Sequence, residues 1–193
     1  MRQHEAIETL KGLDRNGRRV FTHRDFAKLF REDEARTLSD GIDRLINKGV
    51  LIRPARGIYV YEWTERERTH LLHEVARTLR RGFHTYLSLE SALSEYGVIS
   101  QVPSGHHTFM TTGRKGEFRT PYGSIEFTHT SRDPSEFISD LCDNGRPLPI
   151  ATVDRAYRDL KRVGRNLGMV DPDELREELE RANDDGGPDA GFF

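Results

Sequence analysis

Seven residues between positions 24 and 56 have the chemistry needed to contact a nucleic-acid duplex. Arginine forms bidentate hydrogen bonds with phosphates and with guanine edges, lysine supplies a point charge, and threonine bonds to bases or phosphates. The residues are Arg24, Arg36, Thr37, Arg44, Lys48, Arg53 and Arg56. Their types predict a DNA-binding surface, in which some side chains read base edges and others hold phosphates.

The segment from Arg36 to Tyr61 predicts the elements that would position most of these side chains. Leu38, Ile42 and Leu45 recur at the spacing of a helix with one buried face, and Gly49 suits its end. Two short apolar runs then flank a turn, at residues 50–53, 54–57 and 58–61. A helix followed by a hairpin with arginines at its tip predicts a winged helix-turn-helix, whose helix enters the major groove while the wing touches phosphates.

The residues before this segment predict the rest of such a domain. A helix is expected over residues 3–14, and Val20 with Phe21 predicts a third short strand. Thr22 and Asp25 have the spacing of a capping box, which predicts a second helix starting there. We therefore expect a winged helix-turn-helix domain over residues 1–63.

The remaining chain predicts a second domain of mixed α/β structure. Thr64 and Glu67 resemble another capping box and predict a connecting helix over residues 64–82. Within residues 83–183 we expect three more helices and a small antiparallel sheet, a three-stranded meander. The helices are expected near residues 89–96 with Ser88 as the cap, at 150–164 and at 171–182; the strands are expected near residues 107–112, 118 and 124–130. Residues 184–193 predict a disordered acidic tail, and the fold class expected for the chain is α+β.

The charge is unevenly distributed along the 193 residues, whose formal net charge is -2. Residues 1–82 carry 18 Lys and Arg against 13 Asp and Glu, whereas residues 171–193 carry 2 against 9. The excess of positive charge in the first half is modest, and Asp40 and Asp43 are expected to pair with Arg36 and Arg44 at helical spacing. The sequence therefore predicts moderate, salt-sensitive DNA binding.

Composition also bears on the compartment. No apolar run approaches the roughly 20 residues that span a bilayer, and the charged first residues lack the apolar region of a signal peptide. The single cysteine, Cys142, permits no internal disulfide and is expected to be a partly buried structural thiol. We expect a cytoplasmic protein with no cofactor.

The sequence gives little indication of a metal-binding site or a nucleotide-binding site. His70, His73, His106, His107 and His129 are not accompanied by acids or cysteines at the usual zinc spacings, which favours ordinary hydrogen-bonded histidines. The turn Gly113-Arg114-Lys115-Gly116 lacks the spacing of a phosphate-binding P-loop and is expected in a hairpin.

A nucleotidyltransferase would need a Gly-Ser turn leading into a pair of metal-binding carboxylates. Gly123-Ser124 has no such pair after it, and Asp171 with Asp173 fits a helix cap better. The sequence thus predicts no catalytic residue, although an enzyme of this kind stays a weaker alternative.

A basic stripe is expected along the helix at residues 150–164, formed by Arg155, Arg158, Lys161, Arg162 and Arg165. Two interpretations remain open. In the first, the stripe binds a protein partner or makes an additional contact with a DNA phosphate. In the second, it is a salt-bridged surface in which Asp154 and Asp159 pair with Arg158 and Arg162.

Three segments resemble the AbiEi family: YLSLESALSEYGVISQVP at residues 86–103, TFMTTGRKGEFRTPYGSIEFTH at 108–129 and PIATVDRAYRDLKRVGRN at 149–166. They follow a winged helix that ends in RGIYVY, and the resemblance spans about residues 20–170. AbiEi proteins are antitoxins and transcriptional regulators of type IV toxin–antitoxin systems that act in phage abortive infection.

The resemblance implies a repressor that binds inverted repeats in its own promoter and an antitoxin that counteracts an AbiEii-like nucleotidyltransferase toxin. In the family the second domain continues further than it does here, which weakens the antitoxin expectation relative to the DNA binding. The alternatives are a protein-binding module whose DNA contact is secondary, and a stand-alone regulator without a toxin.

Overall fold

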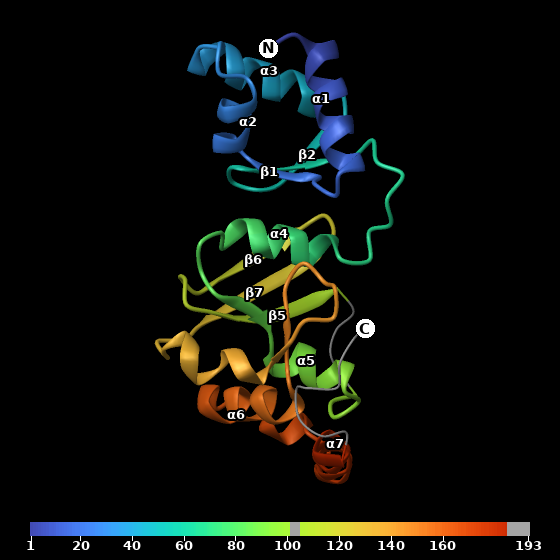
Figure 1. Cartoon of the computed structure of the whole chain (residues 1–193), viewed down its shortest axis with the longest axis vertical. Helices are drawn as coiled ribbons and strands as arrows, with labels where there is room; N and C mark the ends of the chain where they lie inside the picture. The colour runs from blue at the N-terminus through green and yellow to red at the C-terminus, as the bar shows by residue number, and fades with distance from the viewer. Residues whose placement is uncertain (101–104, 185–193) are drawn as a thin grey trace. The chain divides into compact units, whose positions relative to one another are not determined.

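The computed structural model of the chain describes residues 1–100 and 105–184 and has an α+β fold (Figure 1). The chain forms two compact units, one of residues 1–79 with 119–122 and the other of residues 80–118 with 123–193, of which residues 101–104 and 185–193 are not described. Within the described residues, no helix is both long and apolar enough to cross a membrane. The tail expected at 184–193 lies outside the described residues, except for Asp184, which ends the last helix.

The first unit contains four helices and a three-stranded antiparallel sheet among its described residues. They are α1 (Gln3–Arg15), β1 (Val20–Thr22), α2 (His23–Leu29), α3 (Ala35–Asn47), β2 (Leu51–Ala55), β3 (Ile58–Tyr61) and α4 (Leu71–Leu79). Strand β3 lies between β1 and β2, so that Val20 pairs with Val60 and Leu51 with Tyr61. The helix and hairpin predicted between Arg36 and Tyr61 are therefore confirmed as elements.

The apolar spacing of α3 determines which face of the helix is buried. Leu38, Ile42 and Leu45 are buried in one core with residues of α1, α2 and the sheet. The Phe26 ring of α2 packs against Tyr59 of β3, with ring centroids 5.5 Å apart. Because these three apolar side chains share one face, the opposite face of α3 is left to solvent.

The two expected capping boxes have different outcomes. At Thr22 the box is confirmed, because the Thr22 hydroxyl accepts from the Asp25 amide at 3.1 Å and the Asp25 carboxylate accepts from the Thr22 amide at 2.7 Å.

At Thr64 the prediction is wrong, since the helix begins only at Leu71. The Thr64 hydroxyl accepts from the amide of Arg66 and makes a local turn. The Glu67 carbonyl accepts from the buried guanidinium of Arg19 at 2.9 Å, and Arg19 also pairs with Glu74 of α4 at 2.9 Å. A buried arginine thus holds this backbone away from a helical path.

The sheet of the second unit differs from the expected meander. Its elements are β4 (Thr85–Leu87), α5 (Leu89–Glu95), β5 (His106–Thr111), β6 (Gly116–Thr120), β7 (Gly123–His129), β8 (Leu141–Cys142), β9 (Ile150–Ala151), α6 (Val153–Val163) and α7 (Pro172–Asp184). The six strands have the order β6-β7-β5-β4-β9-β8, and β5 pairs with β7 in parallel, His106 opposite Ser124. The turn at residues 113–116 therefore joins strands that are not neighbours and closes no hairpin. Alternating burial is common to parallel and antiparallel strands, so the pattern did not distinguish them.

Helices α5 and α6 pack against each other and against this sheet (Figure 1). Ile150 and Ala151 form a strand instead of the expected first turn of α6, and Thr152 caps the helix by accepting from the Arg155 amide. Ser88 occupies the N-cap position of α5 but makes no capping bond, because its hydroxyl donates to Asp159 instead. Asp171 does cap α7, accepting from the amides of Asp173 and Glu174.

Candidate nucleic-acid interface

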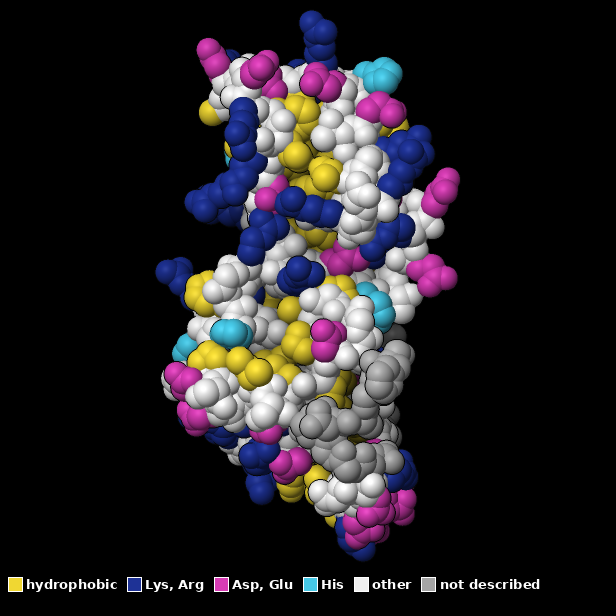
Figure 2. All heavy atoms as spheres, viewed as in Figure 1, with side chains coloured by type: hydrophobic (Ala, Val, Ile, Leu, Met, Phe, Trp, Pro, Cys, Tyr) yellow, Lys and Arg dark blue, Asp and Glu magenta, His cyan; other side chains and the backbone are white. Residues whose placement is uncertain are grey.

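All seven residues predicted to contact a duplex are exposed on the first unit. Arg24 lies near the start of α2; Arg36, Thr37 and Arg44 lie on α3, with Lys48 as its C-cap residue; Arg53 and Arg56 lie on and just after β2. Figure 2 shows Lys and Arg side chains along the side of the unit that carries α2 and the β2–β3 turn in Figure 1. The exposed residues therefore provide a basic surface on the elements expected to carry it.

Helical geometry divides the residues of α3 into two groups. At about 100° per residue, Thr37, Arg44 and Lys48 fall within about 40° of one another and form one line along the helix. Arg36 projects about 80° or more to the side of that line. The three aligned residues are the ones that a single groove would meet together.

The acidic residues on α3 do not pair with these arginines. Among the residues that the structure describes, no ion pair joins Asp40 or Asp43 to Arg36 or Arg44, contrary to the expected helical pairing. The Arg44 guanidinium makes one long bond, 3.4 Å, to the Met1 carbonyl, and Arg53 lies over the Tyr59 ring at 6.0 Å. The guanidinium groups are thus not neutralised by direct contacts, although the two carboxylates still lower the local potential.

The helix predicted to carry a basic stripe in the second unit is not uniformly exposed. Arg155 has 2% of its surface accessible, and Arg165 pairs with Glu90 and Glu126. Arg158 pairs with Asp154, as the salt-bridge interpretation expected, and also with Asp140. Lys161 and Arg162 are exposed, with the Lys161 ammonium 4.9 Å from the Tyr157 ring centroid. Of the five residues, Arg155 is therefore buried, Arg158, Lys161 and Arg162 are exposed, and Arg165 is partly exposed.

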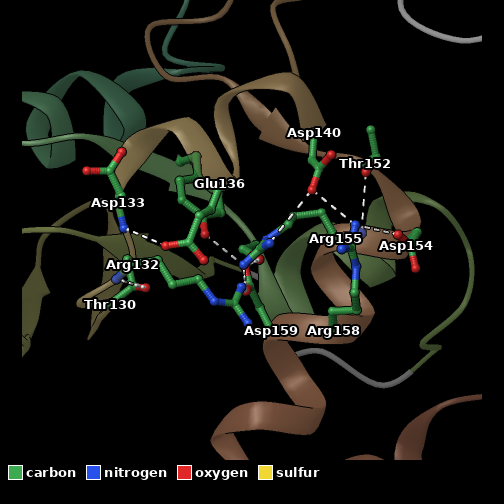
Figure 3. Close-up of polar contacts among 12 residues, drawn as sticks. Thr130, Arg132, Asp133, Glu136, Asp140, Thr152, Asp154, Arg155, Arg158 and Asp159 are labelled. Atoms are coloured by element: carbon green, nitrogen blue, oxygen red, sulfur yellow. Dashed lines mark hydrogen bonds and ion pairs between the residues drawn. The ribbon is translucent and has the colours of Figure 1, made fainter.

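Arg155 belongs to a buried polar network around Asp159, shown in Figure 3. The Asp159 carboxylate is fully buried and accepts from Arg155 at 2.7 Å and from Arg132 at 3.1 Å. The hydroxyls of Tyr86 and Ser88 donate to it at 2.9 and 3.0 Å. Burial, together with the Asp159 charge, raises the pKa of Tyr86 well above its ordinary value. This network joins β4, α6 and the loop after β7, and its side chains bond to one another inside the unit.

A second network surrounds Glu90 of α5, which the sequence did not identify. Burial raises the pKa of the Glu90 carboxyl, but bonds from Arg165 at 2.9 Å and from Asn166 at 2.7 Å outweigh it, so that the pKa lies below its ordinary value. Arg165 also contacts Glu126, whose carboxylate lies 3.6 Å from His106. Arg165 therefore forms ion pairs within the second unit.

The positions of the histidines and of Cys142 bear on metal binding. In the described part of the chain, no group of three or more His, Cys, Asp or Glu residues is placed to hold a metal ion. His106 contacts Ser124 at 2.8 Å, and His129 contacts the Gly113 carbonyl at 2.8 Å. Cys142 is exposed in β8, not partly buried as expected.

Comparisons with known proteins show the fold alone. No protein-family model and no curated protein matches the chain. Among solved structures, the chain is similar to the crystal structure of the RV2827C protein from Mycobacterium tuberculosis, with 20% sequence identity and a TM-score of 0.51. The alignment covers 93% of this chain and 71% of that chain, so the likeness extends over both units of the α+β fold.

Proposed function

We propose that the protein is a sequence-specific, DNA-binding transcriptional regulator whose first unit is a winged helix-turn-helix. The observation that carries the proposal is the exposed α3, followed directly by the β2–β3 hairpin in a sheet of order β1-β3-β2. In this arrangement α3 enters the major groove and the hairpin acts as the wing. The resemblance to AbiEi supports autoregulation through inverted repeats in the protein's own promoter.

The aligned residues of α3 and the arginines of the wing have different proposed roles. Thr37, Arg44 and Lys48 face the groove, where Arg44 reads a base edge. Arg53 and Arg56 contact phosphates and fix the register of the helix. The exposure of all five side chains supports these roles.

A gel-shift and footprinting experiment on the DNA upstream of the gene tests the proposal. The full chain is expected to protect an inverted repeat and to bind it far more tightly than random DNA of the same length. Protection without sequence preference, or no protection, would contradict it. A double variant Arg176→Ala/Arg181→Ala, altered on the exposed α7, is the control for loss of positive charge.

A second candidate function, antitoxin activity, rests on the resemblance and on one observation of the second unit. Lys161 and Arg162 stay exposed on α6 while their neighbours are paired, which leaves a small basic surface for an acidic partner. Coexpression of the full chain with a nucleotidyltransferase encoded beside it tests this role. The wild type is expected to restore growth, and the Lys161→Glu/Arg162→Glu variant is expected to lose this rescue while still binding the promoter. If the variant still restores growth, this surface does not bind the toxin.

A further inference from the structure

The connection before β4 and the turn between β5 and β6 lie together at one end of the second unit's sheet (Figure 1). Phe83 of the connection is 54% exposed although it is a large apolar side chain. Its ring lies over Gly113, where an added Cβ would come within 3.0 Å of the ring. We call this surface the platform; it comprises Arg80, Arg81, Phe83 and the turn Gly113–Gly116.

The backbone of the turn is held in place from three sides. The Arg80 side chain donates from Nε to the Arg114 carbonyl at 2.9 Å. The His129 ring contacts the Gly113 carbonyl at 2.8 Å, and the Thr111 hydroxyl accepts from the Gly113 amide at 3.1 Å. The turn therefore presents the side chains of its two middle residues from a fixed backbone.

Arg80 also contacts two aromatic rings of the sheet, those of Phe118 and Phe127. Its guanidinium lies 4.0 Å from the ring centroid of Phe127 and 5.3 Å from that of Phe118, and an added Cβ at Gly116 would come within 3.6 Å of it. Burial lowers the pKa of the Arg80 guanidinium, but an arginine stays charged at neutral pH in proteins. Arg80 thus links the turn to the aromatic rings of the sheet, and it lies beside Phe83 at Gly113.

The charge of the platform is strongly positive. Residues 80–84 and 113–117 carry four Lys or Arg and one Glu. Arg81, Arg114 and Lys115 are exposed, and Figure 2 shows Lys or Arg side chains beside hydrophobic ones at this end of the unit. An exposed aromatic ring among cations fits a partner that offers flat bases and phosphates together.

We propose that the platform binds single-stranded nucleic acid. Phe83 stacks on an unpaired base, and Arg114 and Lys115 contact the neighbouring phosphates. A duplex cannot stack a base on Phe83, because its bases are already stacked on one another. The site is separate from α3 and the wing and does not depend on their function.

Fluorescence anisotropy with the full chain tests the platform, with labelled oligouridylate and oligothymidylate of about 12 nucleotides and a duplex of equal length as probes. The wild type is expected to bind a single strand, and the two strand probes tell RNA from DNA. Phe83→Leu, which keeps the apolar contact with Gly113 but removes the stacking ring, should weaken single-strand binding about tenfold. Arg114→Ala/Lys115→Ala should reduce the slope of log K against log salt by about 1.4.

Two further variants keep the outcome decisive. Arg176→Ala/Arg181→Ala removes two exposed arginines elsewhere in the unit and should leave single-strand binding unchanged. Arg53→Ala/Arg56→Ala should weaken duplex binding only, which separates failure of the platform from failure of the proposed regulator. The proposal is overturned if the wild type binds neither single strand, if the platform variants lose no more than the α7 control, or if they weaken duplex binding instead. The thermal unfolding midpoint of each variant confirms that it is folded.

Discussion

At the level of single residues, the guanidinium groups on α3 and the wing are exposed and have no carboxylate partner on α3, whereas several guanidinium groups of the second unit are paired or buried. Sequence alone did not separate these two kinds of arginine. Arg155 and Arg36 look alike in sequence, but Arg155 is buried and pairs with Asp159, whose carboxylate also accepts from Arg132 and Tyr86 in distant parts of the chain. An exposed arginine can give its hydrogen bonds to DNA without breaking a contact that stabilises the fold.

Arg44 and Arg56 should respond differently to replacement by alanine. Arg44→Ala should cost about 1–3 kcal/mol on the specific site and relax its sequence preference, because a base contact is lost. Arg56→Ala should weaken binding to specific and random DNA alike and lower the salt slope by about 0.9, because one phosphate contact is lost. Titrations of both DNAs at several salt concentrations measure the difference. Equal losses for Arg44→Ala on specific and random DNA would refute its role at a base.

Asp159 carries the largest predicted effect on stability. Asp159→Asn removes the charge that compensates Arg155 and Arg132, so the free energy of unfolding should fall by about 3–5 kcal/mol. Asp173→Asn, at an exposed pair with Arg176, should change it by no more than about 0.5 kcal/mol. Urea denaturation of the three proteins makes the comparison. Similar midpoints for Asp159→Asn and the wild type would mean that the network contributes little.

Glu90 should make the stability of the second unit depend on pH. Its pKa is lower in the folded protein than the ordinary value of 4.5, so its contribution is fully present above about pH 5 and is lost as the pH falls through the folded pKa. At pH 7, Glu90→Gln should lower the free energy of unfolding by about 1–3 kcal/mol, because the partly exposed Arg165 and the exposed Asn166 lose the charged carboxylate of the buried Glu90. Denaturation at pH 7 and near pH 4 should show the gap between the two proteins narrowing at the lower pH. A gap that widens on acidification has the wrong sign for this explanation.

At the level of elements, local signals predicted α1 to α3 and the hairpin well, because each has its own caps, periodicity or turn residues. The apolar face of α3 and the capping box at Thr22 are both short-range features. The connecting helix and the sheet were predicted less well, because distant residues decide them. The Glu67 carbonyl accepts a hydrogen bond from Arg19. Strand β5 pairs in parallel with β7, although β6 lies between the two in the sequence. No local pattern encodes either contact.

Thr22 and Thr64 allow a matched test of the two expected capping boxes. Thr22→Ala removes the cap of α2, so it should lower the free energy of unfolding by about 0.5–2 kcal/mol. Thr64→Ala removes only a local turn bond and should cost less than about 0.5 kcal/mol. Chemical denaturation followed by circular dichroism compares the two. An equal or larger loss at Thr64 would contradict the assignment of the caps.

At the level of the whole molecule, the chain combines two units with separate cores, and the candidate interfaces lie on different units. The helix and hairpin that carry the proposed duplex surface were predictable, because their caps, periodicity and turn residues are local in the sequence. The platform was not, because Phe83 and Gly113 are brought together only by the sheet. The likeness to the mycobacterial structure supports the fold of both units and leaves their activities to experiment.

The central claim is that α3 and the β2–β3 hairpin recognise a specific duplex. Footprinting of the full chain on the DNA upstream of its gene, at about 0.15 M salt, tests it most directly. We predict protection of an inverted repeat, with half-sites separated by a whole number of helical turns, and loss of that protection in Arg44→Ala. Uniform weak protection that Arg44→Ala leaves unchanged would contradict the account.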